Sequence, residues 1–117
     1  YQRMMAGLLK NQADDGMWRQ LIDYPEAWKE TSGTAMFAYA MVVGVRRGIL
    51  TDPAYTTAYQ KAWSALSTYV QPDGKLREVC AGTGQQNNAQ FYLTRPRNIG
   101  DFHGQAPLLW LSTALFA

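Results

Sequence analysis

The sequence has little of several residue types that mark common classes of protein. Among its 117 residues there is one cysteine, Cys80, and one histidine, His103. A single cysteine excludes an internal disulfide framework and the usual multi-cysteine zinc motifs. The eleven basic residues are scattered singly or in pairs, and the formal net charge is only +2, so no stripe of positive charge suits a phosphate backbone. We expect no metal, no cofactor and no nucleic-acid partner.

Apolar runs of the length that a membrane requires are also missing. The stretch Glu30–Gly48 is almost entirely apolar or small between its ends, but it is too short to span a bilayer of ordinary thickness. A helix that is apolar on every side is then typical of the centre of a larger protein. No signal peptide is visible. We expect no membrane contact and a cytoplasmic location, with the periplasm as the alternative.

The two ends of this apolar stretch predict a helix between them. Thr31 or Ser32 can cap its first turn, because a hydroxyl oxygen accepts hydrogen bonds from unpaired amides. Arg46 and Arg47 suit the negative end of the helix dipole, and Gly48 suits a left-handed residue after the last turn. We therefore predict a helix that is walled in by others.

Three more helices are predicted, separated by two long loops. An amphipathic helix is ended by the turn Asp14-Asp15-Gly16, a half-exposed helix begins at Asp52-Pro53, and an apolar helix follows His103-Gly104 with Pro107 tolerated in its first turn. The intervening segments are an aromatic loop over residues 17–29, a short strand over 75–80 and a polar loop over 81–102. The last helix stops inside an apolar run, which suggests that the sequence is part of a longer one.

An internal repeat links these elements. The segment Gln12–Arg19 is matched by Gln71–Arg77 with one gap, and each copy follows a half-exposed helix and precedes a loop and an apolar helix. A repeating helical hairpin with an outer and an inner member is thereby predicted. Closing such hairpins into a ring would put the apolar helices inside. The predicted fold class is all-α, with residues 1–117 forming a single partial domain.

Three segments carry a resemblance to a known family. Asp15-Gly16-Met17-Trp18-Arg19-Gln20, then Glu30-Thr31-Ser32-Gly33-Thr34-Ala35-Met36-Phe37, then Gly44-Val45-Arg46-Arg47-Gly48 resemble the unsaturated uronyl hydrolases, glycoside hydrolase families 88 and 105. Asp101-Phe102-His103-Gly104 is similar to the start of that family's last inner helix. One departure is Gly33, where the family more often has alanine. The resemblance covers the whole chain but only the C-terminal third or so of a family member.

The resemblance implies an (α/α)6 toroid, of which four helices make about one third. It also implies an enzyme that acts on the Δ4,5-unsaturated uronic acid that polysaccharide lyases leave at the end of oligosaccharides. An aspartic acid protonates C4 of the vinyl ether, water adds at C5, and the hemiketal opens to release the remaining sugar. The family's catalytic aspartate and its Trp-x-Arg-Gly motif are expected upstream of Tyr1, so no catalytic residue is expected in this chain.

Five residues are candidates for substrate binding. Trp18 can stack on a sugar ring, or it can fill its loop. Thr31, Ser32 and Thr34 can bind a uronate carboxylate at a helix N-terminus, or they can act as caps. His103 beside Asp101 can orient a sugar hydroxyl or move a proton, or it can fix the loop.

Two rival functions remain open at this stage. The same part of a toroid can serve as a non-catalytic sugar-binding or assembly module, or it can belong to another toroid enzyme, such as a sugar epimerase or a different glycoside hydrolase. The expected partners are an oligosaccharide with a terminal unsaturated uronic acid, and the remainder of the toroid or another subunit that covers the apolar helices. The choice between glucuronyl and rhamnogalacturonyl substrates also stays open.

Overall fold

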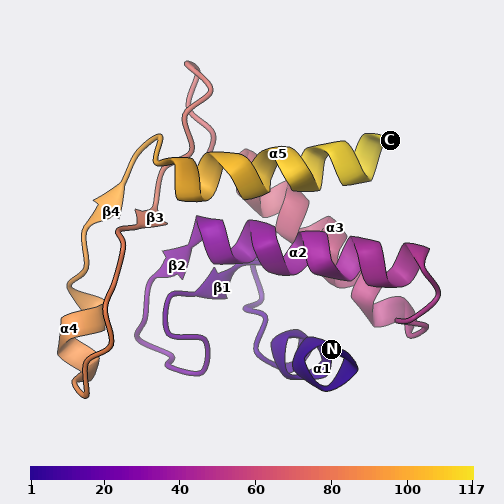
Figure 1. Cartoon of the computed structure of the whole chain (residues 1–117), viewed down its shortest axis with the longest axis horizontal. Helices are drawn as coiled ribbons and strands as arrows, with labels where there is room; N and C mark the ends of the chain where they lie inside the picture. Colours follow the sequence, from indigo (N-terminus) through magenta and orange to yellow (C-terminus); the bar gives the residue numbers. More distant parts are fainter.

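The helix α2 (Thr31–Arg46) is the central element of the computed structural model, which describes all 117 residues. Its apolar sequence is packed on two sides, by α3 (Pro53–Ser67) and by α5 (Phe102–Phe116), and α5 lies alongside it (Figure 1). The predicted end of α2 is confirmed, since Gly48 has a φ of 67°. Its predicted cap is wrong: the residue that caps the first turn is Glu30.

The outer helices follow their sequence signals. α1 (Gln2–Lys10) buries Met5 and Leu8 on one side. The Asp52 carboxylate accepts a hydrogen bond from the amide of Ala54 at 2.8 Å, and Pro53 is the first residue of α3, as predicted. α3 then turns one face to α2, and the buried residues on it are Tyr55, Ala58, Ala62 and Leu66. Full burial of a large apolar side chain such as Leu66 contributes about 1.5–3 kcal/mol.

The last helix begins one residue before the predicted histidine. Asp101 caps α5 by accepting a hydrogen bond from the amide of His103 at 3.0 Å. Pro107 lies in the second turn of α5, not in the first as predicted. Gly104 lies against the side chains of Val79 and Leu76, so this glycine allows the start of α5 to approach the segment before it closely.

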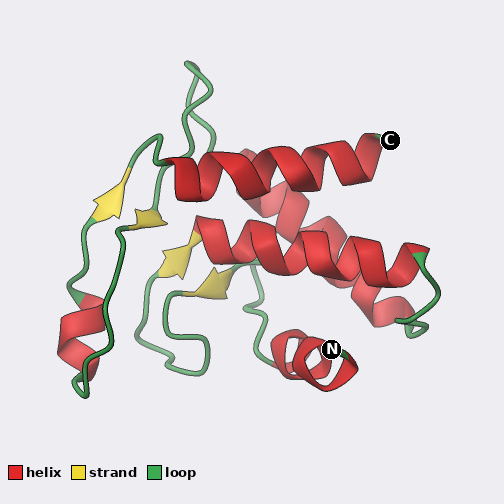
Figure 2. Ribbon diagram, viewed as in Figure 1, coloured by secondary structure: helices red, strands yellow, loops and turns green.

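Two small antiparallel sheets lie where α2 and α5 begin (Figure 2). β1 (Trp18–Arg19) pairs with β2 (Lys29–Glu30), with Trp18 opposite Glu30. β3 (Val79–Cys80) pairs with β4 (Arg97–Asn98), with Val79 opposite Asn98. Of these four strands only β3 was predicted, and it is shorter than the strand predicted over 75–80. The segment predicted as a polar loop also contains the short helix α4 (Ala89–Leu93).

The predicted internal repeat is confirmed in the backbone of the two turns. Gly16 and Gly74 both have positive φ, 90° and 84°. The aspartate before each glycine, Asp15 or Asp73, accepts a hydrogen bond from the amide two residues further on, at 3.0 and 3.1 Å. A left-handed glycine after an aspartate is what such a turn requires.

The repeat extends to the way each turn is attached to the following inner helix. The amide of Trp18 donates to the Thr34 hydroxyl at 2.9 Å, and the amide of Leu76 donates to the Gln105 side chain at 2.6 Å. Thr34 and Gln105 each lie four residues after the cap of their own helix. Each inner helix is therefore held to the turn that follows its own outer helix by an equivalent hydrogen bond.

The core lies between α2, α3 and the loops, while one side of the two apolar helices is open. The fully buried large side chains include Met5, Met17, Trp18, Met41, Leu66 and Leu111. By contrast, α5 exposes Phe102, Leu109, Trp110 and Phe116. The prediction that α2 is walled in by other helices is therefore met by α3 and α5, whereas α5 leaves one side exposed. None of the helices combines the length and the apolar character needed to cross a membrane.

Candidate functional site

A hollow of about 490 Å³ lies where α2 begins, between the loop that follows β1 and the loop that follows β3. Its apolar lining is contributed mainly by Leu21, Met36 and Phe37. Its polar lining comes from both loops and from the first turn of α2, and includes Gln20, Glu30, Ser32, Thr83 and Gln85. Both long loops of the chain thus meet at one place, which we call the inter-loop pocket.

Glu30 organises the inter-loop pocket. Its side chain is only 6% exposed, and one carboxylate oxygen accepts hydrogen bonds from the amide and the hydroxyl of Ser32 at 3.0 and 2.7 Å. The same oxygen accepts from the amide of Cys80 at 3.0 Å, and the other accepts from the amide of Gly33 at 2.6 Å. Glu30 therefore caps α2 and joins it to β3 across the repeat.

The outer wall of the pocket is held by its own hydrogen bonds. The Tyr92 hydroxyl accepts from the amide of Gln86 at 2.8 Å and donates to the carbonyl of Gln86 at 2.9 Å. Thr83 donates to the carbonyl of Ala81 at 2.6 Å. These contacts are local, because each joins residues no more than six apart in the sequence, and they shape the segment opposite α2.

The two arginines of the second loop are engaged outside the pocket. Arg95 donates to the carbonyl of Gly82 at 2.7 Å and to the Thr83 hydroxyl at 3.2 Å. Arg97 pairs with Glu78, and its guanidinium lies 4.8 Å from the centre of the Trp28 ring. None of the residues that line the inter-loop pocket is basic.

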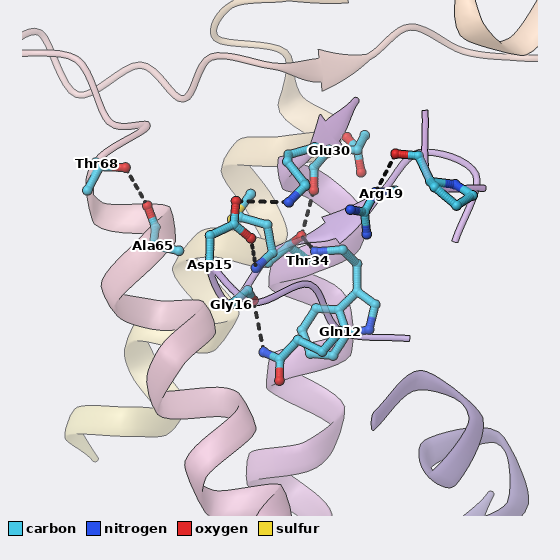
Figure 3. Close-up of polar contacts among 12 residues, drawn as sticks. Gln12, Asp15, Gly16, Arg19, Glu30, Thr34, Ala65 and Thr68 are labelled. Carbon is cyan, nitrogen blue, oxygen red and sulfur yellow. Dashed lines mark hydrogen bonds and ion pairs between the residues drawn. The ribbon is translucent and has the colours of Figure 1, made fainter. Parts of the chain in front are cut away.

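Trp18 is buried, as the second of its two predicted roles, filling its loop, requires. Its side chain is 1% exposed, its indole nitrogen donates to the carbonyl of Leu8 at 2.7 Å, and its ring meets Phe37 edge-on. Thr34 is also fully buried and donates to the carbonyl of Glu30 at 2.6 Å, as Figure 3 shows. Trp18 fills its loop, and neither of these two residues lies at the inter-loop pocket.

The expected anion site at the start of α2 is taken by the protein itself. Thr31 is fully buried, and its hydroxyl donates to the carbonyls of Arg77 and Glu78 at 2.9 and 3.1 Å. The amides of Ser32 and Gly33, which were expected to attract a uronate, already donate to Glu30. Of the three hydroxyl residues proposed for this role, only Ser32 lines the pocket.

His103 lies apart from the inter-loop pocket. It lines a separate hollow of about 370 Å³ with Met36, Phe102 and Trp110. Its Nδ1 lies 3.0 Å from a carboxylate oxygen of Asp101. Hydrogen bonds from the Asn98 side chain and from the backbone and ring of His103 lower the pKa of Asp101 below its ordinary value. This carboxylate is therefore a hydrogen-bond acceptor that holds the exposed imidazole.

Sequence reasoning missed Glu30, the residue with the largest role in the site. The signal that could have revealed it is its place directly before a predicted helix start, where an acceptor is needed. Thr31 and Ser32 are preferred caps by residue type, so they were chosen instead. Gln20, Thr83 and Gln85 were missed because nothing in the local sequence shows that the two loops meet.

These features define a class of protein. Repeated helical hairpins with outer helices, adjacent apolar inner helices, and a pocket at the loops between them are the parts of an α/α toroid of the kind found in carbohydrate-active enzymes. The model of Glycosyl Hydrolase Family 88 matches residues 1–116. The chain belongs to this family, which confirms the resemblance seen in its sequence.

Individual relatives agree with this assignment. The chain is 33% identical over 78 residues to the unsaturated 3S-rhamnoglycuronyl hydrolase of Formosa agariphila, covering 65% of the chain and 21% of the relative. It is 29% identical over 92 residues to the unsaturated rhamnogalacturonyl hydrolase YesR of Bacillus subtilis, covering 79% of the chain and 25% of the relative. The chain thus spans about a fifth to a quarter of the length of these curated relatives.

Solved structures confirm the predicted fold class. A Salmonella enterica protein described as a possible member of glycoside hydrolase family 105 superposes with a TM-score of 0.92 at 30% identity, over 97% of this chain and 30% of that one. A Klebsiella pneumoniae protein described in the same way gives a TM-score of 0.88 at 31% identity, over 95% of this chain and 29% of that one. The hairpins therefore correspond to a part of those larger folds.

Proposed function

We propose that the chain is part of a glycoside hydrolase that removes a Δ4,5-unsaturated uronic acid from the end of lyase-generated oligosaccharides. The observation that supports this most strongly is the family match over nearly the whole chain, together with relatives that are named as unsaturated 3S-rhamnoglycuronyl and unsaturated rhamnogalacturonyl hydrolases. The chemistry is hydration of the vinyl ether: a proton is added at C4 and water at C5, and the hemiketal opens and releases the remaining sugar.

The part of this chain in the reaction is to hold the substrate. In the proposal, Ser32 at the inter-loop pocket and His103 at the neighbouring hollow contact the oligosaccharide. The acid that protonates C4 is an aspartate outside Tyr1–Ala117, within the length of the relatives that this chain does not span. The remainder of the toroid covers the exposed apolar side of α2 and α5, because soluble proteins rarely leave such patches open.

The test compares an unsaturated disaccharide with its saturated counterpart, using the protein expressed from its complete open reading frame. The proposal predicts release of the second sugar only from the unsaturated disaccharide, with simultaneous loss of its double bond. Turnover of the saturated disaccharide would instead favour another toroid enzyme. Binding without any turnover would favour a non-catalytic sugar-binding module. Both of these results contradict the proposal.

A further inference from the structure

Glu78 has a backbone conformation that its residue type rarely adopts. It is the one non-glycine residue of the chain with a positive φ, at 63°. In this left-handed conformation Cβ comes too close to a backbone carbonyl oxygen, and a glycine would adopt it without that cost. Strained residues of this kind are found at functional sites, where the surrounding contacts hold them in place. The contacts of Glu78 therefore indicate its role.

The side chain of Glu78 joins the two loops that form the inter-loop pocket. Its carboxylate forms an ion pair with Arg97 of β4, at the end of the second loop. The Arg97 guanidinium lies 4.8 Å from the centre of the Trp28 ring, in the first loop. The carbonyl of Trp28 in turn accepts a hydrogen bond at 2.9 Å from the amide of Gln20, which lines the pocket. We call Glu78, Arg97 and Trp28 the Glu78 cluster.

The backbone contacts of the Glu78 cluster also lie next to the pocket lining. The carbonyl of Glu78 accepts hydrogen bonds from the amide and the hydroxyl of Thr31, both at 3.1 Å, and Thr31 directly precedes Ser32. Arg97 is paired with Cys80 across β3 and β4. Ser32 and Cys80 both line the pocket. The cluster thus fixes the start of α2 and the two loops relative to one another.

Stability does not account for a glutamate at this position. The side chains of Arg97 and Glu78 are 49% and 21% exposed, and an ion pair as exposed as this contributes little to the free energy of unfolding. The two hydrogen bonds to the carbonyl of residue 78 would be made equally by a glycine, without the strain. The glutamate side chain is therefore explained by what it positions.

We infer that Glu78 and Arg97 are positioning residues, which hold the start of α2 and both loops in the arrangement that binds the substrate. They act through Gln20, Ser32 and Cys80, whose places their contacts fix. The inference rests on the proposed function, and it goes beyond it by assigning a role to two residues that do not line the pocket themselves.

The first test is the steady-state kinetics of the protein expressed from its complete open reading frame, with an unsaturated rhamnogalacturonan disaccharide as substrate. For Glu78→Gly and for Arg97→Met we expect KM to rise about three- to tenfold with kcat unchanged, because binding is weakened equally in the ground state and the transition state. Arg97→Lys keeps the ion pair but not the planar group over Trp28, and its KM is expected to lie in between.

Two comparisons separate positioning from stability and from charge. Glu78→Gly relieves the backbone strain, so its melting temperature is expected to be no lower than that of the parent protein while its KM rises. Lys75→Met removes a cation from the exposed ion pair with Asp73, and it is expected to leave KM unchanged. An unchanged KM in both Glu78→Gly and Arg97→Met, or an equal rise in Lys75→Met, overturns the inference.

Hydrogen exchange gives a readout that does not require catalysis. The amides of Gln20 and Cys80 donate to Trp28 and to Glu30, and we expect both to exchange at least about threefold faster in Glu78→Gly and Arg97→Met, with the amides of α3 unchanged. Unchanged exchange at Gln20 and Cys80 overturns the inference. If the parent protein shows no turnover, the proposed function alone is refuted, and the exchange rates decide whether the Glu78 cluster holds the loops.

Discussion

Glu30 shows how one side chain connects distant parts of the sequence. It accepts hydrogen bonds from residues two, three and fifty positions away, and it does so with a carboxylate that is almost completely buried. A buried charge is tolerated only where donors replace its water. At this position the donors are the unpaired amides at the start of α2 and the amide of Cys80, so the cap of the helix and the wall of the pocket depend on the same group.

Replacing Glu30 tests this double role. Glu30→Ala leaves the amides of Ser32, Gly33 and Cys80 without their acceptor, and we expect a loss of about 2–4 kcal/mol in the free energy of unfolding. Asp52→Ala, which removes an exposed cap of α3, is the control and is expected to cost about 1 kcal/mol. Urea denaturation measures both. Equal losses would mean that Glu30 acts as an ordinary cap.

Asp15 gives the fold a predictable response to acid. Burial alone would raise the pKa of Asp15, but the hydrogen bond from Lys29 at 2.9 Å, the amide of Met17 and the charges of Lys29 and Arg19 outweigh it and lower the pKa. A lowered pKa means that the charged form stabilises the fold above the ordinary value of 3.8. This stabilisation is lost as the pH falls through the lower folded value.

We therefore expect Asp15→Asn to reduce the free energy of unfolding near neutral pH by a few tenths to about 1 kcal/mol, since the pair is half exposed. The difference from the parent protein should shrink as the pH falls below the ordinary value of 3.8 and through the lower folded value. Asp14→Asn, at an exposed neighbouring aspartate without an ion pair, serves as the control. Urea denaturation at several pH values gives the result. A difference that stays constant with pH would show that the charge of Asp15 does not contribute.

At the scale of the element, the four long helices could be predicted from sequence, whereas the short helix α4 and the pairings between loops could not. Asp52-Pro53 and Gly48 fix the ends of α3 and α2 by local geometry, which any reader of the sequence can apply. The two-residue strands arise only because segments brought together by the hairpins pair with each other. Thr31 shows the same limit, because its partners are carbonyls 46 and 47 residues away.

The two repeated turns allow a matched comparison. Gly16 and Gly74 share a positive φ, but a Cβ on Gly16 would lie 2.6 Å from the carbonyl oxygen of Lys61, whereas a Cβ on Gly74 would meet open space. Gly74→Ala is expected to cost about 1–2 kcal/mol from backbone strain. Gly16→Ala adds a clash with the backbone of α3 and is expected to exceed about 3 kcal/mol. Equal losses in urea denaturation would contradict the tight packing of the first turn.

At the scale of the whole molecule, the inner helices leave one side with large apolar side chains exposed. Soluble proteins normally cover such a side with another part of the molecule or with a partner. Trp110 is 53% exposed in the chain, next to Tyr39 of α2. In the protein expressed from its complete open reading frame, we expect this side to be covered. Trp110→Lys should then cost more than about 2 kcal/mol, because it buries a charge. At an exposed position, the same substitution changes the free energy of unfolding by no more than about 0.5 kcal/mol. Such a small change would contradict the prediction, because it would show that this side stays open to water. Thermal and urea denaturation measure the change.

The position of the inter-loop pocket is also explained only at this scale. In the toroid, outer helices connect to inner helices at one end of the ring, and both long loops of the chain lie there (Figure 1). Of the five residues predicted to contact the substrate, only Ser32 lines this pocket. Trp18, Thr31 and Thr34 hold the loops and helices together, and the pocket is formed by residues around them.

The most direct test of the proposed activity is the ultraviolet absorbance of the unsaturated uronate. The protein expressed from its complete open reading frame is incubated with an unsaturated rhamnogalacturonan disaccharide, and the absorbance of the conjugated double bond is followed. The account predicts a continuous fall in absorbance, with one molecule of the second sugar released for each double bond lost. Release of that sugar with the double bond intact would contradict hydration, and unchanged absorbance with no release would contradict the proposed hydrolase.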